Sequence, residues 1–290
     1  MFGLSRQVYY RRIRATNSRK TRAQEVIDLI VPIRRRMPRI GTRKLYFLLK
    51  PKLELLGIGR DKLFAIMKAN HLEVKPERSY RVTTFSHHRF RKHKDLVNGL
   101  FITRPEQVWV SDITYMQSGV GHHYLALVTD AYSKKIVGYD LSNSLQTEGV
   151  LRAMKMAIKT RKYQQSVLIH HSDRGLQYCS NEYQRLLSNH KITCSMTTDS
   201  DPYSNAIAER VNGIIKNEFC IEKYKVDLIT QQKIVSETIA IYNDERPHYS
   251  CSYLTPNQMH CQSKLPIKTY KNKKGSRNVP ATFEKTTFIL

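Results

Sequence analysis

The 290-residue chain is long enough for one large domain and one or two small ones, and its 40% hydrophobic content permits a sizeable core. The five cysteines are scattered and include no C-x-x-C pair, so the sequence indicates neither a disulfide framework nor a four-cysteine zinc site. No apolar run approaches the ~18 to 20 residues of a membrane span, and no apolar stretch follows the basic start of the chain as in a secretory signal. We therefore expect a cytoplasmic protein that does not bind a membrane.

The net charge of +25 indicates a polyanionic partner, and the placement of the charge is more informative than its size. Residues 1–104 hold 26 Lys and Arg against 7 Asp and Glu, whereas residues 105–224 hold 13 against 12. A basic arm therefore precedes a nearly neutral body. A ribosomal-type extension is the competing interpretation, but ribosomal proteins are usually basic throughout.

The first third of the sequence has the apolar spacing of helices. Residues 23–37 carry such a pattern, with an expected break or kink at Pro32, and turns at residues 39–42 and 57–60 open two further helices. Two short basic helices joined by a glycine-containing turn are typical of a helix-turn-helix, although three basic helices also describe a small bundle. We expect residues 1–75 to bind DNA. The candidate contacts are Arg43, Lys44, Arg60 and Lys62.

Residues 76–105 sustain no periodicity and mix arginine and lysine with aromatic residues. Such a mixture can stack on bases and neutralise phosphates, and it equally describes a flexible tether. We expect a basic linker here and a loose basic tail over residues 263–290.

From residue 106 the pattern changes to short β-rich runs alternating with helical segments. Three strands come first, and strands and helices alternate after them, which predicts a mixed central sheet with helices on both faces. The expected domain covers residues 106–262. Its expected strands are 108–116, 123–129, 135–139, 167–171 and 192–196, and its expected helices are 147–162, 181–189, 203–222 and 228–242.

Three carboxylates stand out by their positions in this domain. Asp112 lies in the middle of the first strand, Asp173 directly follows the fourth, and Glu209 lies in the long helix after the fifth. If the first and fourth strands are neighbours, the two aspartates converge and the helix can present Glu209 to both. Hard oxygen ligands on rigid elements are what Mg²⁺ or Mn²⁺ requires, and two such ions ~3.5–4 Å apart can promote phosphodiester chemistry.

Each of these carboxylates also has an ordinary structural interpretation, as an edge-strand charge, a turn or cap residue, and a solvated helix position, respectively. Asp130, Asp199 and Asp201 compete for the metal role, but Asp130 heads a turn and the other two fall where helix caps belong. The three carboxylates together with a basic arm favour a metal site that acts on nucleic acid.

Six ordered segments carry a resemblance to a known family. They are WVSDITY at 109–115, DAYSKKIVG at 130–138, HSDRGLQYCS at 171–180, NAIAE at 205–209, YNDERPH at 242–248 and LTP at 254–256. Residues 107–260 resemble the catalytic region of the insertion-sequence-three family of bacterial transposases, and the first hundred residues resemble its helix-turn-helix segment more loosely. Thirty-five residues separate Asp173 from Glu209, which is the interval of that family's DD(35)E triad.

The resemblance implies an RNase H-like core of the kind shared with retroviral integrases. It implies a DNA transposase in which Asp112, Asp173 and Glu209 hold two Mg²⁺ ions, with Mn²⁺ as an alternative. Such an enzyme cleaves DNA at the ends of its element and joins the freed 3′-hydroxyl to target DNA. Lys216 matches a basic residue of the family. On an α-helix it shares a face with Glu209, ~10 Å away, where it is either a DNA phosphate contact or a solvated lysine.

The resemblance also implies the partners of the chain. They are element-end and target DNA, further copies of the chain in a homo-oligomer, and a protein from an upstream reading frame that supplies another DNA-binding segment. A nucleoid-associated bacterial location follows. Two alternatives remain open: a non-catalytic DNA-binding repressor that retains the fold, and a nuclease or retroviral-type integrase with the same core.

Overall fold

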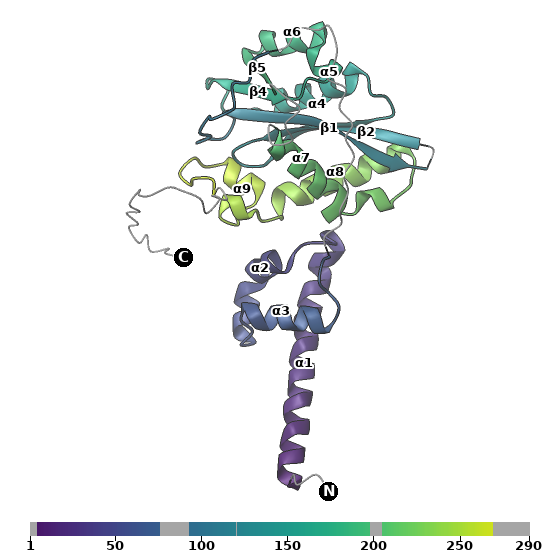
Figure 1. Cartoon of the computed structure of the whole chain (residues 1–290), viewed down its shortest axis with the longest axis vertical. Coiled ribbons are helices and arrows are strands. Elements are labelled where there is room, and N and C mark those ends of the chain that lie inside the picture. Colours follow the sequence, from purple (N-terminus) through teal and green to yellow (C-terminus); the bar gives the residue numbers. More distant parts are fainter. Residues whose placement is uncertain (1–4, 76–92, 120, 198–204, 269–290) are drawn as a thin grey trace.

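The computed structural model of the chain describes residues 5–75, 93–119, 121–197 and 205–268. Figure 1 shows an N-terminal helical region below a sheet domain, with the first half of a long helix projecting away from both. The expected linker and tail fall partly outside the described residues, at 76–92 and 269–290. None of the described helices is long and apolar enough to cross a membrane.

The helical region consists of α1 (Arg6–Arg36), α2 (Thr42–Leu55) and α3 (Arg60–Ala69). The hydroxyl of Ser5 caps the first turn of α1. Of the break or kink expected at Pro32, the break does not occur, because α1 runs through this residue. Pro32 removes one hydrogen bond to the preceding turn, and the burial of Val26 and Ile30 against α2 and α3 holds the helix across that gap.

The described residues of the second region form a five-stranded sheet in the order β3-β2-β1-β4-β5, which confirms the predicted mixed sheet. Strand β1 pairs antiparallel with β2 and parallel with β4; β2 pairs antiparallel with β3, and β4 parallel with β5. The first and fourth strands are therefore neighbours, which is the condition under which Asp112 and Asp173 were expected to converge. The strands are β1 (Val108–Ser118), β2 (Gly121–Asp130), β3 (Ile136–Ser142), β4 (Leu168–Ser172) and β5 (Ile192–Met196).

Helices cover both faces of the sheet. One face packs its side chains against α4 (Thr147–Lys159), α5 (Leu176–Cys179) and α6 (Asn181–Asn189). The other face packs against α7 (Ala206–Gly213), the π-helical segment η1 (Ile214–Glu218) and α8 (Leu228–Asp244). Both faces are buried, so β2 is apolar on both sides, with Leu125 and Leu127 in one core and Ala126 and Val128 in the other.

A glycine sets the close approach of α4 to the sheet. A side chain at Gly138 on β3 would place its Cβ 2.1 Å from the carbonyl oxygen of Ala153 in α4. The sheet domain ends with η3 (Tyr249–Cys251) and α9 (Pro256–His260), and η2 (Ile221–Lys223) connects η1 to α8. Helix α9 begins with a capping box between Thr255 and Gln258.

The helical region packs against the α7 side of the sheet domain rather than standing apart from it. The buried apolar side chains of α1, α2 and α3 form one continuous cluster with those of α7, η1 and α8. The amide of Arg39 donates to the carbonyl of Glu218 at 3.0 Å, and Lys44 Nζ lies 3.2 Å from a carboxylate oxygen of the same residue. The end of η1 is therefore the polar anchor of this contact.

Candidate active site

The parallel pairing of β1 and β4 brings two of the predicted carboxylates to one place. Ser111 of β1 pairs with Ser172 of β4, and the next residues along the two strands are Asp112 and Asp173. The carboxylate of Asp173 accepts a hydrogen bond of 3.1 Å from the amide of Gly175, two residues further along the chain. Two carboxylates therefore meet where the central pair of strands diverges.

The carboxylate of Asp112 is oriented on both of its oxygens. The amide of Ile113 donates to Oδ1 at 2.9 Å, and the side-chain amide of Asn212 in α7 donates to Oδ2 at 2.8 Å. Burial, followed by the charge of Asp173 and then that of Glu209, raises the pKa of Asp112 to about 7. No lysine or arginine among the described residues forms an ion pair with it.

The start of α7 is fastened to β1 beside this carboxylate. The side-chain amide of Asn205, which is buried, donates to the carbonyl of Ser111 at 2.9 Å, and the amide of Glu209 donates to the Asn205 carbonyl at 3.1 Å. Glu209 and Asn212 are three residues apart and share a helix face. Burial raises the pKa of Glu209 above its ordinary value. Glu209 was predicted from the sequence and Asn212 was not, although its helical spacing from Glu209 would have placed it beside the site.

A buried polar network joins β1 to β4 and α6 next to Asp112. His170 of β4 lies 2.8 Å from the Ser111 hydroxyl and 3.1 Å from the Tyr183 hydroxyl, and all three side chains are buried. Burial lowers the pKa of His170 to about 3, so the ring is neutral and structural. This network fixes the residue before Asp112, which contributes to the rigidity that a metal ligand requires.

The three carboxylates interact through their charges rather than by direct contact. Among the described residues, no three side chains of His, Cys, Asp and Glu converge closely enough to share one ion. The competing residue Asp130 lies at the far end of β2, where its carboxylate accepts from the amide and hydroxyl of Ser133 in a turn. Asp199 and Asp201 lie outside the described residues.

The expected α-helix over residues 203–222 is wrong in its second half. Helix α7 ends at Gly213, and η1 follows with the wider π-helical spacing, in which the amide of Phe219 donates to Ile214 five residues back at 3.3 Å. The α-helical stacking of Lys216 over Glu209 therefore does not apply. Lys216 Nζ lies 2.7 Å from the Glu222 carboxylate.

The four basic residues of the N-terminal helices that were proposed to contact DNA have different surroundings in the structure. Arg43 is exposed in the first turn of α2, whereas Lys44 is turned toward Glu218 and burial lowers its pKa to about 8. Arg60 pairs with Asp61 at 2.9 Å, and Lys62 donates to the carbonyl of Gly57 at 3.1 Å. Lys44 thus lies in the contact between the two regions.

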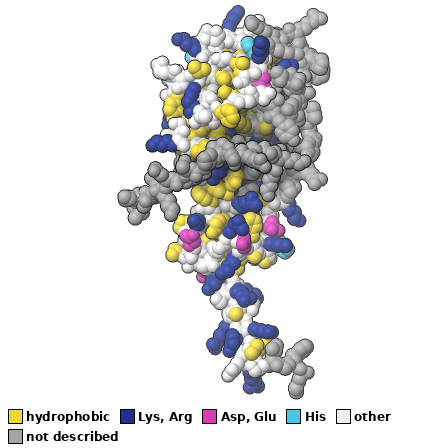
Figure 2. Space-filling model, turned by 60° about the vertical axis from the view of Figure 1, so that its left-hand side comes forward, with side chains coloured by type: hydrophobic (Ala, Val, Ile, Leu, Met, Phe, Trp, Pro, Cys, Tyr) yellow, Lys and Arg dark blue, Asp and Glu magenta, His cyan; other side chains and the backbone are white. Residues whose placement is uncertain are grey.

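The projecting half of α1 is the most exposed basic element of the described structure. Figure 2 shows Lys and Arg side chains along it. The exposed cations are Arg6, Arg11, Arg12, Arg14, Arg19, Lys20 and Arg22. A helix that carries these exposed cations is suited to a polyanionic surface.

Comparison with known proteins agrees with this architecture. Residues 102–202 match the family described as integrase core domain, and residues 190–256 match a second family of the same description. The chain is 32% identical over 263 residues to an uncharacterized 31 kDa protein of insertion element IS600 from Shigella sonnei, covering 88% of this chain and 94% of that protein. The structure of the HTLV-2 integrase catalytic core domain in complex with magnesium covers 54% of this chain and 97% of its own, at 21% identity and a TM-score of 0.43.

Other relatives are named as transposases. The chain is 30% identical over 197 residues to transposase InsF for insertion sequence IS3A of Escherichia coli K12, covering 67% of this chain and 68% of the relative. It is 35% identical over 184 residues to a putative transposase for IS986/IS6110 of Mycobacterium tuberculosis, covering 61% and 65%. With its integrase core domain and these relatives, the chain belongs to the insertion-sequence-three family of transposases and is a polynucleotidyl transferase.

Proposed function

We propose that this transposase cleaves DNA at the ends of its insertion element and joins the freed 3′-hydroxyl to target DNA, using Mg²⁺ held by Asp112, Asp173 and Glu209. The observation that carries the proposal is the carboxylate of Asp112. It is partly buried between two other negative charges and forms no ion pair with a described lysine or arginine. A divalent cation supplies the missing positive charge.

The donor set fits a hard cation. Three carboxylates and the waters around them are the oxygen ligands that Mg²⁺, and in its place Mn²⁺, takes in proteins. When bound, a pair of such ions activates the attacking oxygen and stabilises the leaving oxygen of a phosphodiester. The same arrangement serves water in cleavage and a 3′-hydroxyl in strand transfer, since only the nucleophile differs.

The protein's own part is to orient the carboxylates and hold them in place. Ile113 and Asn212 each donate to one oxygen of Asp112, which leaves the remaining lone pairs of both oxygens for the cation. Asn205 fastens the start of α7 to β1, so Glu209 is carried on a helix whose position relative to Asp112 is fixed.

We propose further that residues 1–75 bind DNA, followed by a linker over 76–105, the catalytic domain over 106–262 and a basic tail over 263–290. The charge of the N-terminal third and the exposed basic face of α1 support this division. Lys216, Arg43, Lys44, Arg60 and Lys62 are the proposed DNA contacts. The enzyme would act on the bacterial nucleoid as a homo-oligomer, with a protein of an upstream reading frame as an additional partner.

The test is a Mg²⁺-dependent nicking and strand-transfer assay on duplexes that carry the element's terminal repeats. Glu209→Gln should lower both activities at least ~100-fold, a loss of ~2.7 kcal/mol of transition-state stabilisation. Glu237→Gln is the matched control, because Glu237 is an exposed glutamate in α8. Equal activity of wild type and Glu209→Gln would refute the assignment. A wild-type protein that binds the ends and never cuts them would favour the repressor alternative.

A further inference from the structure

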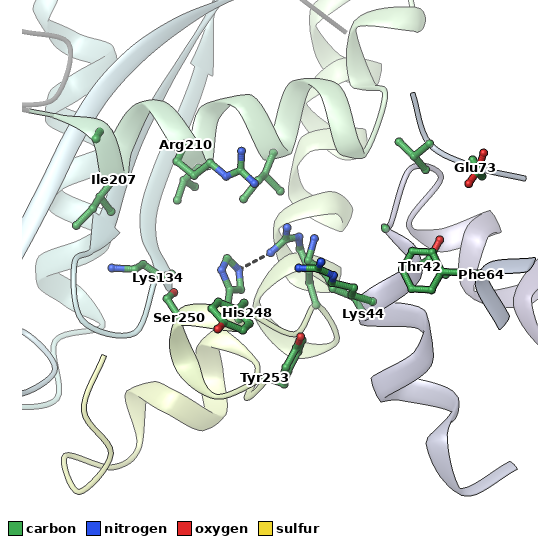
Figure 3. Close-up of a pocket in the computed structure, with 18 residues that line it drawn as sticks. Thr42, Lys44, Phe64, Glu73, Lys134, Ile207, Arg210, His248, Ser250 and Tyr253 are labelled. Carbon is green, nitrogen blue, oxygen red and sulfur yellow. Dashed lines mark hydrogen bonds between the residues drawn. The ribbon is translucent and has the colours of Figure 1, made fainter. Parts of the chain in front are cut away.

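A cavity of about 580 Å³ lies between the helical region and the sheet domain. Its walls come from the first turn of α2, from one side of α7, and from the segment that includes Arg246, His248 and Tyr253. Figure 3 shows side chains from both regions surrounding this space, with Arg210 above it and Lys44 opposite. Neither region forms the cavity alone.

The described lining of this cavity is strongly positive. Its basic residues are Arg43, Lys44, Lys134, Arg210 and Arg246, and its one described carboxylate is Glu73. Glu218 neutralises part of the charge by pairing with both Lys44 and Arg246. Five cations against two carboxylates leave a surplus of three positive charges, and a cation surplus with a low-dielectric wall attracts an anion.

Two of these cations are not engaged by the described part of the protein. Neither Arg43 nor Arg210 forms an ion pair or a side-chain hydrogen bond with a described residue, and both are exposed. Arginine presents a planar set of donors that matches the oxygens of a phosphate. A phosphate in the cavity would therefore meet two guanidinium groups that have no competing carboxylate.

A buried histidine adds a neutral donor. His248 is 7% exposed, and its Nε2 accepts a hydrogen bond from the guanidinium of Arg246 at 2.8 Å. Because arginine can only donate, Nε2 carries no proton and the ring hydrogen lies on Nδ1. Nδ1 has no hydrogen-bond partner among the described residues, and the ring lines the cavity.

The backbone at the start of α2 also favours an anion in the cavity. Gly41 is the N-cap of this helix and offers no side chain to the first amides, and residues 41–44 line the cavity. The unpaired amides and the positive end of the helix dipole favour an anion at this position.

We propose that this cavity binds a phosphate of the DNA backbone next to the active site, a proposal that rests on the function proposed above. Glu209 and Arg210 are adjacent on α7, so their side chains leave the helix on different faces, one toward Asp112 and one toward the cavity. A helix is ~10 Å across, which corresponds to about three nucleotides at ~3.4 Å each along a strand. The cavity would thus hold a phosphate a few nucleotides from the reacting one and join both regions of the chain to the same DNA end.

The experiment measures binding of the full chain to a short DNA duplex by fluorescence anisotropy, without divalent cations, between about 50 and 200 mM salt. Arg210→Gln should reduce the slope of log K against log salt by about 1, the contribution of one phosphate contact, and Arg210→Lys should restore most of it. Arg185→Gln is the matched control, because Arg185 is an exposed arginine of α6 on the opposite face of the sheet. Thermal melting of each variant checks that it is folded.

Broadening of the ³¹P signal of inorganic phosphate separates DNA from a free anion as the ligand. A reduced slope in Arg210→Gln supports the proposal whether or not free phosphate also binds. An unchanged slope in Arg210→Gln overturns the proposal, even if the ³¹P signal of free phosphate is broadened. An equal reduction of the slope in Arg185→Gln also overturns it. The assay requires no cleavage, so a failure of Glu209→Gln to abolish catalysis would leave its outcome interpretable.

Discussion

The side-chain amide of Asn212 donates a hydrogen bond of 2.8 Å to the Asp112 carboxylate, linking the helix that carries Glu209 to the central strand. Asn212 is 5% exposed, and its own Oδ1 is buried without a hydrogen-bond partner among the described residues. A buried amide that leaves one polar atom unsatisfied costs free energy. The cost is consistent with a positioning role rather than with simple packing.

Asn212→Ala should therefore lower the affinity of the site for Mg²⁺ while all three carboxylates remain in place. Loss of the residue that orients a metal ligand typically lowers metal affinity or activity ~10- to 100-fold. The expected result is a higher Mg²⁺ concentration for half-maximal nicking, with activity partly regained at saturating Mg²⁺. Asn217→Ala is the control, because Asn217 is exposed in η1. An unchanged Mg²⁺ dependence in Asn212→Ala would contradict the positioning role.

The raised pKa of Asp112 predicts a stability effect in the metal-free protein. The pKa rises from 3.8 to about 7, so ionised Asp112 destabilises the fold. The cost is absent below about pH 4, grows as pH rises through the interval, and is complete above pH 7. Three pKa units correspond to at most about 4 kcal/mol. Asp112→Asn should therefore raise the free energy of unfolding at pH 8 by up to this amount and change it little at pH 4.5.

The measurement for Asp112→Asn is guanidinium unfolding in EDTA at both pH values. Adding Mg²⁺ should then stabilise the wild type more than the variant, because the cation binds the native carboxylates. A variant that is less stable than wild type at pH 8 in EDTA would show that the carboxylate is compensated in some other way.

The sequence predicted the sheet and the position of two carboxylates because both depend on short-range patterns. Apolar runs separated by turns marked the strands, and a charge inside β1 and another just after β4 were visible against that background. The pairing of β1 with β4 was left open by the sequence as a condition of the site, and the structure meets this condition. Glu209 was proposed from its place in the long helix after the fifth strand, and the family's interval of thirty-five residues from Asp173 then supported it.

The parts that the sequence did not predict depend on tertiary contacts. The change from α7 to the π-helical η1 at Ile214 has no composition signal, since Ile214 and Ile215 suit either helix type and are buried in the shared core. Lys44 was assigned to DNA because its charge is visible in the sequence, whereas its partner Glu218 is 174 residues away. Long-range ion pairs of this kind cannot be read from spacing.

The contact between the two regions centres on Glu218, and its two cationic partners should contribute unequally. Burial alone would raise the pKa of Glu218, but Arg246 first and Lys44 second hold it below its ordinary value. Arg246 forms two hydrogen bonds to the carboxylate, at 3.0 and 2.7 Å, and its side chain is 2% exposed. Lys44 is more exposed, and burial lowers its pKa to about 8.

Arg246→Met should accordingly cost about 3–5 kcal/mol of unfolding free energy, because it leaves a buried carboxylate with one weak partner. Lys44→Met should cost less than about 1 kcal/mol. Ionised Glu218 stabilises the fold above its ordinary pKa, and this stabilisation is lost as the pH falls through its lowered pKa in the folded protein. The cost of Arg246→Met should therefore shrink in acid. Chemical denaturation at pH 7 and pH 3.5 measures both effects. Equal costs for the two variants would contradict the assignment.

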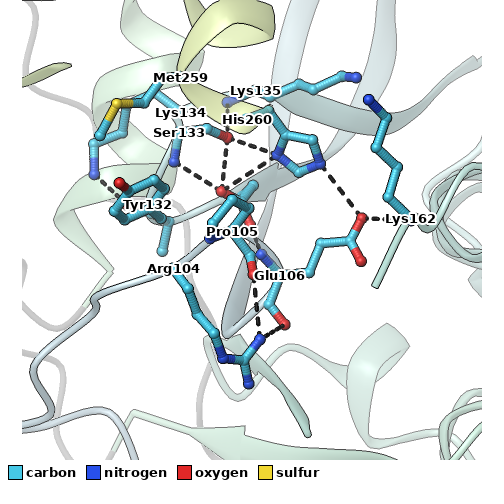
Figure 4. A network of polar contacts seen from close by, with 12 residues as sticks. Arg104, Pro105, Glu106, Tyr132, Ser133, Lys134, Lys135, Lys162, Met259 and His260 are labelled. Atoms are coloured by element: carbon cyan, nitrogen blue, oxygen red, sulfur yellow. Dashed lines mark hydrogen bonds and ion pairs between the residues drawn. The ribbon is translucent and has the colours of Figure 1, made fainter. Parts of the chain in front are cut away.

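A second buried cluster lies beside the start of β1, where β2 ends. His260 donates to the Ser133 hydroxyl at 3.0 Å and lies 3.3 Å from Glu106 and 3.7 Å from Asp130 (Figure 4). The Ser133 hydroxyl itself donates to Asp130 at 2.6 Å, so it accepts from the histidine. Asp130 pairs opposite Trp109, which is three residues before Asp112, ~10 Å along β1. The cluster fastens α9 to the start of β1 and the end of β2.

Burial acts to lower the pKa of His260, but its hydrogen bonds to Asp130 and Glu106 outweigh burial and raise it, while the pKa values of both carboxyls are lowered. The stabilisation from the histidine is complete below its ordinary pKa of ~6.5 and is lost as pH rises through the raised value. The stabilisation from the carboxyls is present above ~4 and is lost in acid. The cluster is therefore strongest between these limits.

His260→Gln should lower the free energy of unfolding by about 3 kcal/mol at pH 6 and by less at pH 9. The reason is that the two buried carboxylates lose the positive charge of His260. Nicking activity at pH 7.5 should remain near wild type in the fraction that is folded. His190→Gln, an exposed histidine at the end of α6, is the control and should change stability at neither pH. A cost for His260→Gln that is the same at both pH values would mean that the ring acts as a neutral packing group, since only the protonated form gains from the two carboxylates.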